Sequence, residues 1–304
     1  MIYTLTLNPC LDYFVNCGGE LEFGKTNRAK SAQLHFGGKG INVTMALKNM
    51  GVQSKAVVAL GGKNGDRIAA ELNENNIDYI RFESNGESRI NVKINTNDIE
   101  TEINANGADI SLNIQQDIID FFANLDESDT IILAGSMPKN CNCDFYAKIL
   151  QAAKCKFKIA DCTNKALKSA LEQGVFLAKP NIDELCEFFG QNISWNDVPQ
   201  YAKKLCDMGV QNALVSAGDI GAVLCTQNGK AYKAYAPKGE LGCATGAGDT
   251  MLAGFVYSQI CGQCAEQSLK FAVAAGSAKA FCNGFATMES IITLVDKIVI
   301  EEVF

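Results

Sequence analysis

Short runs of apolar residues alternate with longer segments that repeat apolar side chains at helical spacing over most of the 304 residues. The short runs predict buried β-strands, and the longer segments predict α-helices, two of which are stopped by Gly51 and Gly209. The expected strands span residues 2–7, 56–60, 130–134, 157–160, 175–178 and 213–215, and the expected helices span residues 41–50, 66–75, 114–125, 144–153 and 198–208. This alternation predicts a mostly parallel sheet covered by helices on both faces, with ligands at the carboxyl ends of its strands.

Two segments, at about residues 12–33 and 88–106, interrupt this alternation with polar patterning and no helix to cover them. Within the second, residues 90–94 and 101–103 predict a β-hairpin that turns at residues 95–98. Together the two segments predict a small separate sheet that projects from the main domain as a lid over a site. Because repeats, low-complexity tracts and linker-like stretches are absent from the sequence, we expect one domain over residues 1–304 that carries this lid.

Composition narrows the class of protein. Hydrophobic residues make up 47% of the chain, enough for a large core, and the formal net charge is −7. A negative chain without basic patches is unsuited to nucleic acid or to a membrane surface, although local cations could still bind a small anion. No apolar run approaches the roughly 18 residues of a membrane span, and the first residues lack the pattern of a signal peptide, so we expect a cytoplasmic protein.

Thirteen cysteines and one histidine accompany this composition. In a reducing compartment, buried thiols are expected rather than disulfides. The pairs Cys141/Cys143 and Cys261/Cys264 have spacings that fit no standard zinc site, and His35, between Leu34 and Phe36, is expected to pack rather than to catalyse.

Residues 242–250, Gly-Cys-Ala-Thr-Gly-Ala-Gly-Asp-Thr, lead directly into the apolar run at residues 251–257. The glycines let the backbone turn tightly, and a helix beginning near Gly248 would direct N–H groups and the positive end of its dipole at an anion. A carboxylate beside a bound phosphate is repelled unless it has a proton to accept, so Asp249 is a candidate base for phosphoryl transfer to a hydroxyl. Asp249 as a simple helix cap is the alternative interpretation.

A second candidate phosphate loop, residues 19–26, matches the letters of a P-loop. We reject it because two glutamates lie inside the would-be cradle and no helical pattern follows it. Lys25 and Arg28 remain candidate cations near the lid.

Residues 37–42, Gly-Gly-Lys-Gly-Ile-Asn, form another glycine-rich loop before a helix. Lys39 and Asn42 offer donors to hydroxyls or to a phosphate, whereas the alternative is a tight strand-to-helix turn. Together, the loops at residues 37–42 and 242–250 suggest that the protein binds two substrates, one at each loop.

Asn181 and Glu184 follow a predicted strand and are three residues apart, so on the first turn of a helix they share a face. Their oxygens could hold Mg²⁺ through water, or they could form a capping box, and both can hold at once.

Residues 88–93 alternate strictly, which places Arg89, Asn91 and Lys93 on one face of a lid strand. Aligned cations suit a phosphate carried by the substrate, and solvated charges on an edge strand are the alternative.

Taken together, these motifs resemble those of the ribokinase-like, or PfkB-type, carbohydrate kinases from residue 1 to about residue 290. The branch of 1-phosphofructokinases and tagatose-6-phosphate kinases is the most similar. The resemblance rests on motifs in one order: residues 4–9 with Leu11-Asp12, Asn27-Arg28, residues 37–43, 89–93 and 101–104, Gly135-Ser136, residues 179–181 with Glu184, and residues 246–249. Thr245 stands where the family usually has valine.

The resemblance implies a three-layer α/β/α fold and assigns roles to single positions. Asp249 would be the base, and the amides of Gly246, Ala247, Gly248 and Asp249 the anion hole. Substrate would be bound by Asp12, Lys25, Arg28, Gly38, Lys39, Asn42, Arg89, Lys93, Glu102, Asn104 and Ser136. ATP would be bound by Lys179, Asn181, Ser216, Gly218, Gly221, Gly246, Gly248, Ser277 and Asn283, with Asn181 and Glu184 organising Mg²⁺.

The same resemblance implies an ATP- and Mg²⁺-dependent kinase that converts fructose 1-phosphate to fructose 1,6-bisphosphate and forms a homodimer through its lid sheets. Tagatose-6-phosphate kinase is the nearest alternative. A sugar-phosphate-binding regulator without catalysis is an alternative from another class. A nucleoside kinase would leave the cationic lid strand without a purpose. Neither a nucleic acid nor a membrane is an expected partner.

Overall fold

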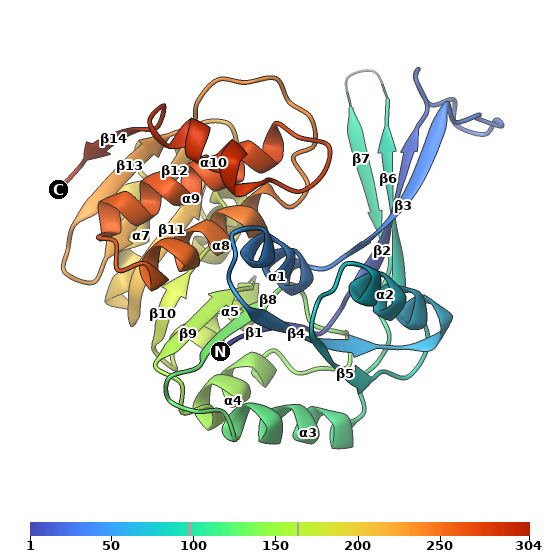
Figure 1. The fold of residues 1–304 in the computed structure, drawn as a ribbon, viewed down its shortest axis with the longest axis horizontal. Coiled ribbons are helices and arrows are strands. Elements are labelled where there is room, and N and C mark those ends of the chain that lie inside the picture. The colour runs from blue at the N-terminus through green and yellow to red at the C-terminus, as the bar shows by residue number, and fades with distance from the viewer. Residues whose placement is uncertain (97–98, 163) are drawn as a thin grey trace.

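Two β-sheets organise the computed structural model, which describes residues 1–96, 99–162 and 164–304 (Figure 1). The larger sheet has ten strands in the order β14-β13-β12-β11-β10-β9-β8-β1-β4-β5. Its strands are β1 (Ile2–Thr6), β4 (Ser54–Leu60), β5 (Tyr79–Glu83), β8 (Thr130–Ala134), β9 (Phe157–Asp161), β10 (Val175–Ala178), β11 (Val210–Ser216), β12 (Gly221–Thr226), β13 (Ala231–Tyr235) and β14 (Val299–Glu302). Strands β5 to β11 of this order run parallel, and β12, β13 and β14 continue the sheet antiparallel.

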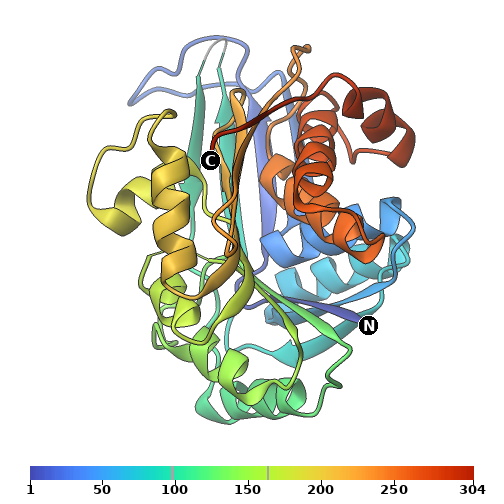
Figure 2. The same ribbon diagram turned by 90° about the vertical axis from the view of Figure 1, so that its left-hand side faces the viewer.

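Helices cover both faces of this sheet, as the edge-on view in Figure 2 shows. The helices are α1 (Lys39–Asn49), α2 (Gly62–Glu74), α3 (Leu112–Ala123), α4 (Phe145–Ala152), α5 (Asn164–Leu171), α6 (Ile182–Phe189), α7 (Val198–Asp207), α8 (Ala247–Ile260), α9 (Ala265–Ala280) and α10 (Met288–Val295). One face packs against α3 to α7, and the other against α1, α2 and α8 to α10. Fully buried Leu5 and Leu133 face the first layer, whereas Leu177 and Leu214 face the second. The strand-helix alternation therefore produces the predicted three layers.

All the predicted strands and helices of the main domain are present, with ends that differ by a few residues. The prediction missed β5, the antiparallel strands β12 to β14 and the helices α5, α9 and α10. The apolar run Ala222–Cys225 of β12 was a strand signal that the prediction overlooked, whereas β14 is a four-residue edge strand with a weak signal. Gly221 is also required by the packing, since its φ is +137° and an added Cβ would lie 1.9 Å from the carbonyl oxygen of Ala234.

The second sheet is the predicted lid, with strand order β3-β2-β6-β7. It consists of β2 (Cys10–Asn16), β3 (Ser31–Gly37), β6 (Arg89–Asn95) and β7 (Glu100–Asn104). Figure 1 shows it standing beside the main sheet rather than continuing it. Strand β3 runs on to Gly37, beyond the predicted limit at residue 33, because Leu34 and Phe36 pack with Leu11 on the cluster beneath α2. Residues 97–98 of the expected hairpin turn lie outside the described residues.

The cysteines and the histidine differ from expectation. All thirteen cysteines are free thiols, but only Cys10, Cys155, Cys162, Cys206 and Cys225 are buried. His35 is exposed on the lid, where its ring meets that of Phe14 edge to face at 5.5 Å. It was expected to be packed because of its apolar neighbours, but strand alternation turns those neighbours to the other face of the sheet.

Among the described residues, no helix is both long and apolar enough to cross a bilayer.

Candidate active site

The carboxyl ends of the parallel strands gather polar side chains at one edge of the main sheet. Asp161 is the last residue of β9, Lys179 follows β10, and Ser216 ends β11. Helices α1 and α8 begin against this edge, because Lys39 of α1 forms an ion pair with Asp161 and Lys179 lies close to Gly248 of α8. The structure thus brings together residues that the sequence separates by more than 200 positions.

The first turn of α8 forms an anion cradle. Gly246 precedes it with a φ of +82°, a left-handed conformation that glycine adopts without strain. Within the part of the chain that is described, the N–H groups of Gly248 and Asp249 have no hydrogen-bond acceptor, whereas that of Thr250 bonds the Gly246 carbonyl at 2.9 Å. Free N–H groups at the positive end of a helix dipole attract an anion.

Asp249 lies on this first turn and is only 6% exposed. Its Oδ2 accepts a hydrogen bond of 2.7 Å from Nδ2 of Asn42 on α1, not from an N–H of its own helix. The simple cap interpretation is therefore wrong. Burial, followed by the nearby charge of Asp161, raises the pKa of the Asp249 carboxyl above its usual value. A raised pKa suits a group that must accept a proton.

Asp161 is an acidic residue that the sequence analysis missed. It is 1% exposed and lies between two ammonium groups, with Oδ1 3.1 Å from Nζ of Lys39 and Oδ2 3.3 Å from Nζ of Lys179. Burial opposes its ionisation, but the charges of Lys179 and Lys39 outweigh burial and lower its pKa. The signal was available, because a carboxylate directly following a buried strand at residues 157–160 lies at the ligand-binding edge.

Lys39 therefore has different neighbours from those expected. Besides Asp161, its Nζ lies 3.4 Å from Oε1 of Glu184. Its burial would lower its pKa, but Asp161, Glu184 and Asp249 together raise it, so this lysine is a fixed positive charge. The sequence assigned it to sugar hydroxyls, whereas here its partners are the carboxylates at the edge of the sheet.

Asn181 and Glu184 form the capping box of α6. The Asn181 side chain accepts from the Glu184 N–H at 2.7 Å, and Oε2 of Glu184 accepts from the Asn181 N–H at 2.9 Å. Oε1 of Glu184 still faces Asp161 across the Lys39 ammonium. Both of the interpretations of this pair therefore remain compatible with its geometry.

The carboxylates of Asp161 and Glu184 fit a divalent cation held partly through water. Asp161 Oδ2 is buried and lies 3.3 Å from the Lys179 ammonium, but among the described residues it accepts no aligned hydrogen bond, so a lone pair can still bind a cation. In the described ranges, no group of three or more His, Cys, Asp or Glu side chains could hold a metal ion. Water and substrate oxygens would have to complete the coordination, as is usual for Mg²⁺.

The polar face of the lid meets the α8 loop. Asp12 of β2 is buried, and its Oδ1 accepts from Nδ2 of Asn91 on the neighbouring β6 at 3.0 Å. No group in the described part of the chain donates to the buried oxygen of that amide. Lys93 bonds Glu102 of β7 at 2.5 Å and reaches Oγ1 of Thr245 at 3.5 Å. The lid strand and the loop before α8 thus enclose one polar space.

The remaining predicted lid residues make hydrogen bonds within the chain. Arg89 donates to the carbonyl oxygens of Asn8 at 3.2 Å and Ala105 at 3.4 Å. The Asn8 amide also donates to the Ser136 hydroxyl at 3.3 Å, which joins the segment between β1 and β2 to the segment that follows β8. Asn104 is exposed, and its amide donates to Glu102 at 3.3 Å.

Gly38 has a packing requirement of its own. Its φ is +134°, and an added Cβ would lie 2.7 Å from Cγ2 of Thr6 on β1. The absence of a side chain lets α1 begin directly against β1, which supports the tight-turn interpretation of residues 37–42.

Lys25 and Arg28 are not brought to this space. Both are exposed, and Lys25 forms an ion pair with Glu22. They belong to residues 17–30, which lie at the end of the lid furthest from the main sheet (Figure 1). No helix follows residues 19–26, so the rejection of a P-loop there is confirmed.

Comparison with known proteins identifies the fold and its chemistry. Residues 5–291 match the pfkB family of carbohydrate kinases. The chain belongs to this family. It is 39% identical to a 1-phosphofructokinase of Bacillus subtilis, with 98% of each chain covered. It is 34% identical to a D-tagatose-1-phosphate kinase of Bacillus licheniformis, with 96% of each covered. The crystal structure of a putative phosphofructokinase from Staphylococcus aureus superposes with a TM-score of 0.83 at 34% identity, covering 100% of this chain and 99% of the other.

The residues expected to bind ATP in this kinase lie at the ends of β10 and β11, at the starts of β12 and α8, and near the end of α9. Lys179 is 4% exposed, and an added Cβ on Gly248 would lie 3.4 Å from its Nζ. Ser216 pairs with Asn181 in an isolated parallel β-bridge. Ser277 is buried on α9. An added Cβ on its neighbour Gly276 would lie 3.2 Å from the carbonyl oxygen of Ala247. Gly218 and Asn283 are exposed, and an added Cβ on Gly242 would lie 3.2 Å from Oδ1 of Asn283.

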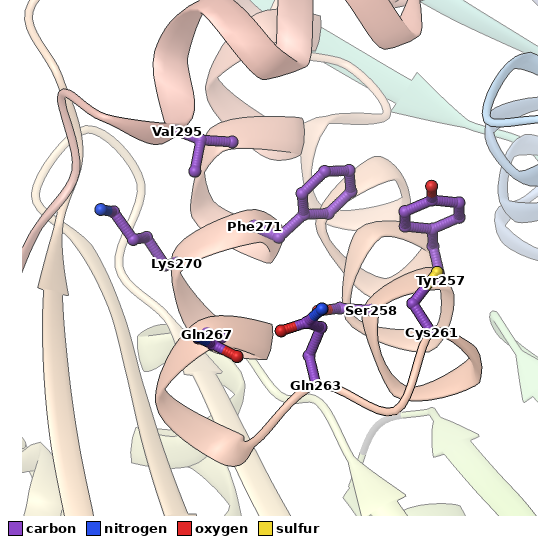
Figure 3. Close-up of a pocket in the computed structure, with 8 residues that line it drawn as sticks. All are labelled: Tyr257, Ser258, Cys261, Gln263, Gln267, Lys270, Phe271 and Val295. Atoms are coloured by element: carbon purple, nitrogen blue, oxygen red, sulfur yellow. The ribbon is translucent and has the colours of Figure 1, made fainter.

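A pocket of about 400 Å³ lies elsewhere, around the C-terminal end of α8 and the start of α9 (Figure 3). Tyr257 and Phe271 stack beside it at 5.0 Å, and Lys270 and Gln267 extend along its other side. Because α8 is 14 residues long, this pocket is remote from Asp249 at its opposite end.

Proposed function

We propose that this chain is an ATP- and Mg²⁺-dependent kinase that phosphorylates fructose 1-phosphate on its 6-hydroxyl and produces fructose 1,6-bisphosphate. The observation that carries the proposal is the buried carboxylate of Asp249 beside two free N–H groups at the start of α8. A base next to an anion cradle is the arrangement that phosphoryl transfer to a hydroxyl requires. The similarity to the 1-phosphofructokinase of B. subtilis supports the choice of sugar.

In this mechanism Asp249 accepts the proton of the 6-hydroxyl as that oxygen bonds to the γ-phosphorus and the bond to ADP breaks. The N–H groups of Gly248 and Asp249 stabilise the charge on the transferring group, and Asn42 holds the Asp249 carboxylate in place. The ammonium of Lys179 lies beside the same helix terminus. Mg²⁺, held by Asp161 and Glu184, would neutralise phosphate charge when bound.

The polar face of the lid supplies the acceptor site in this proposal. Asp12 and the donor-free oxygen of Asn91 can orient sugar hydroxyls, and Lys93 offers a charge to the phosphate that the sugar already carries. Tagatose 6-phosphate remains the alternative acceptor, because the same base and cradle would serve it. The relative from B. licheniformis makes tagatose 1-phosphate a further substrate to test.

A coupled assay of ADP release tests this function. We expect the highest kcat/KM with fructose 1-phosphate among a panel that includes fructose 6-phosphate, tagatose 6-phosphate, tagatose 1-phosphate and ribose. A higher kcat/KM for tagatose 6-phosphate would favour the alternative kinase. Thermal stabilisation by a sugar phosphate without transfer to any of them would instead indicate a regulator that lacks catalysis.

We further propose that two copies pair through the lid. Strand alternation gives the lid sheet an outer face that is apolar, and its register places Tyr13 beside Val92, and Val92 beside Ile103. Tyr13, Ile90 and Ile103 are 39%, 41% and 57% exposed. On the opposite face, Asp12, Asn91 and Lys93 are only 8%, 5% and 6% exposed. A contiguous apolar surface of this kind favours association with a second sheet.

Ile103→Lys tests this pairing. We expect light scattering to give twice the mass of one chain for the wild type and the mass of one chain for Ile103→Lys, because a charge on the outer face cannot be buried unpaired. Ile292→Lys on α10 is the matched control, since Ile292 is 58% exposed. A dimer that survives Ile103→Lys, or that Ile292→Lys disrupts equally, contradicts the proposal.

A further inference from the structure

Lys279 is a buried ammonium next to the anion cradle that none of the expected roles uses. It lies in the last turn of α9 and is 7% exposed. Its Nζ donates to the carbonyl oxygen of Cys243 at 3.0 Å, and an added Cβ on Gly246 would lie 3.7 Å from its Cε. The side chain therefore extends from α9 to the loop that precedes α8.

The end of α9 holds this loop through several backbone contacts. The carbonyl oxygen of Ala280 accepts from the N–H groups of Gly242 at 2.9 Å and Cys243 at 3.1 Å. An added Cβ on Gly242 would lie 2.9 Å from the backbone of Cys282. Lys279 is thus fixed relative to the cradle by the same packing that positions the glycine loop.

Lys279 differs from the other two lysines of the site in having no counter-charge. Lys39 is paired with Asp161 and Glu184, and Lys179 with Asp161. Within the described ranges, no carboxylate lies within 4.0 Å of the Lys279 ammonium. Buried charges in proteins are normally paired, so an unpaired one beside an anion cradle indicates that the missing partner is an anionic ligand.

We propose that Lys279 is a positioning residue whose charge balances the terminal phosphate of the nucleotide in the cradle at Gly246–Asp249. It acts through space by adding a fixed positive charge next to the free N–H groups, and its hydrogen bond to the Cys243 carbonyl holds the ammonium in place. This inference rests on the proposed kinase function, and it adds a charge partner that the Gly-Ala-Gly-Asp motif does not supply.

The alternative is a purely structural tie between α9 and the loop, with the charge stabilised by the C-terminal end of α9. Two variants separate the possibilities. Lys279→Gln keeps an N–H donor for the Cys243 carbonyl but removes the charge, whereas Lys279→Met removes both. If the charge matters, both variants behave alike and Lys279→Arg retains most of the function.

The experiment measures calorimetric binding of AMP and of the β,γ-imido analogue of ATP, neither of which needs a sugar. We expect Lys279→Gln and Lys279→Met to weaken the ATP analogue about tenfold while AMP binding changes less than twofold, because only the analogue carries a terminal phosphate. With fructose 1-phosphate, kcat should fall on the order of 10- to 100-fold while the KM for the sugar stays within about twofold. Lys270→Met, on the same helix but lining the remote pocket, is the control.

Three results would overturn the inference: unchanged binding of the ATP analogue, equal weakening of AMP, or a Lys279→Gln variant that matches the wild type. A melting temperature for each variant separates loss of fold from loss of charge. If the wild type phosphorylates no sugar phosphate, the proposed function fails, but the comparison of AMP with the ATP analogue still decides the role of Lys279.

Discussion

Asp249→Asn is expected to lower kcat by roughly 10²- to 10⁴-fold while ATP still binds, because the amide cannot accept the hydroxyl proton. The substitution keeps the shape of the side chain and its contact with Asn42. Single-turnover kinetics and calorimetric ATP binding measure the two effects separately. Asp183→Asn is the control, since Asp183 lies in the first turn of α6 as Asp249 does in α8, but it is exposed. Near-normal turnover of Asp249→Asn would remove Asp249 as the base.

The raised pKa of Asp249 also predicts a pH dependence. The base must be ionised, so kcat/KM should fall on the acidic side at a pH above the range of an ordinary aspartate, whose pKa is about 3.9. A folded-state pKa above the unfolded value means that the ionised group destabilises the fold as pH rises through that window. Asp249→Asn should therefore melt at a higher temperature than the wild type near neutral pH, with the difference disappearing in acid. If Asp249→Asn melts at the same or a lower temperature than the wild type at neutral pH, the pKa of Asp249 is not raised by burial in the folded protein.

The second large effect is expected from Asp161→Asn, which should destabilise the protein by about 3–5 kcal/mol because it leaves Lys179 buried without a counter-charge. Lys179 is 4% exposed, and Asp161 is its only ion-pair partner among the described residues, whereas Lys39 keeps Glu184. Urea unfolding measures the loss. The double variant Asp161→Asn/Lys179→Met should recover much of it, since it removes both charges.

Ionisation of Asp161 affects stability in the opposite direction to ionisation of Asp249: it stabilises the folded protein. The folded-state pKa of Asp161 lies below its usual value, so its stabilisation is complete above the unfolded pKa and is lost only as pH falls through the lower folded value. The stability difference between wild type and Asp161→Asn should therefore be constant around neutral pH and narrow only in strong acid. A difference that vanishes near pH 6 would show that Asp161 is not ionised in the way that its two lysines require.

Activity should fall with Asp161→Asn as well, because Asp161 fixes Lys39 and Lys179 and is a proposed ligand of the divalent cation. Glu127→Asn serves as the control for a broken ion pair, since Glu127 pairs with Lys156 on the exposed surface at 3.6 Å. We expect less than about 1 kcal/mol from that change.

Local patterns were sufficient for the layers of the fold and for the first turn of α8. The run Thr130–Ala134 is apolar from its second residue on, which is typical of a strand buried on both faces, and it forms β8 with the predicted bounds. The sequence also predicted the capping box of Asn181 and Glu184, because this motif depends only on two residues three positions apart. The antiparallel direction of the strands beyond β11 could not be predicted, since it depends on the pairing of β12 with β11 and β13 and not on a local pattern.

By itself, the sequence determined the three-layer alternation, the polar lid strands and the glycine loop that carries Asp249, because these depend on the period of apolar residues and on backbone freedom over a few positions. Only the tertiary structure decided which charges face one another. Asp161 meets Lys39 across 122 positions, and Lys279 meets Cys243 across 36, through the register of β9 and the packing of α9 on α8. Coulomb energies and desolvation depend on distances between groups and on burial, neither of which any local pattern contains.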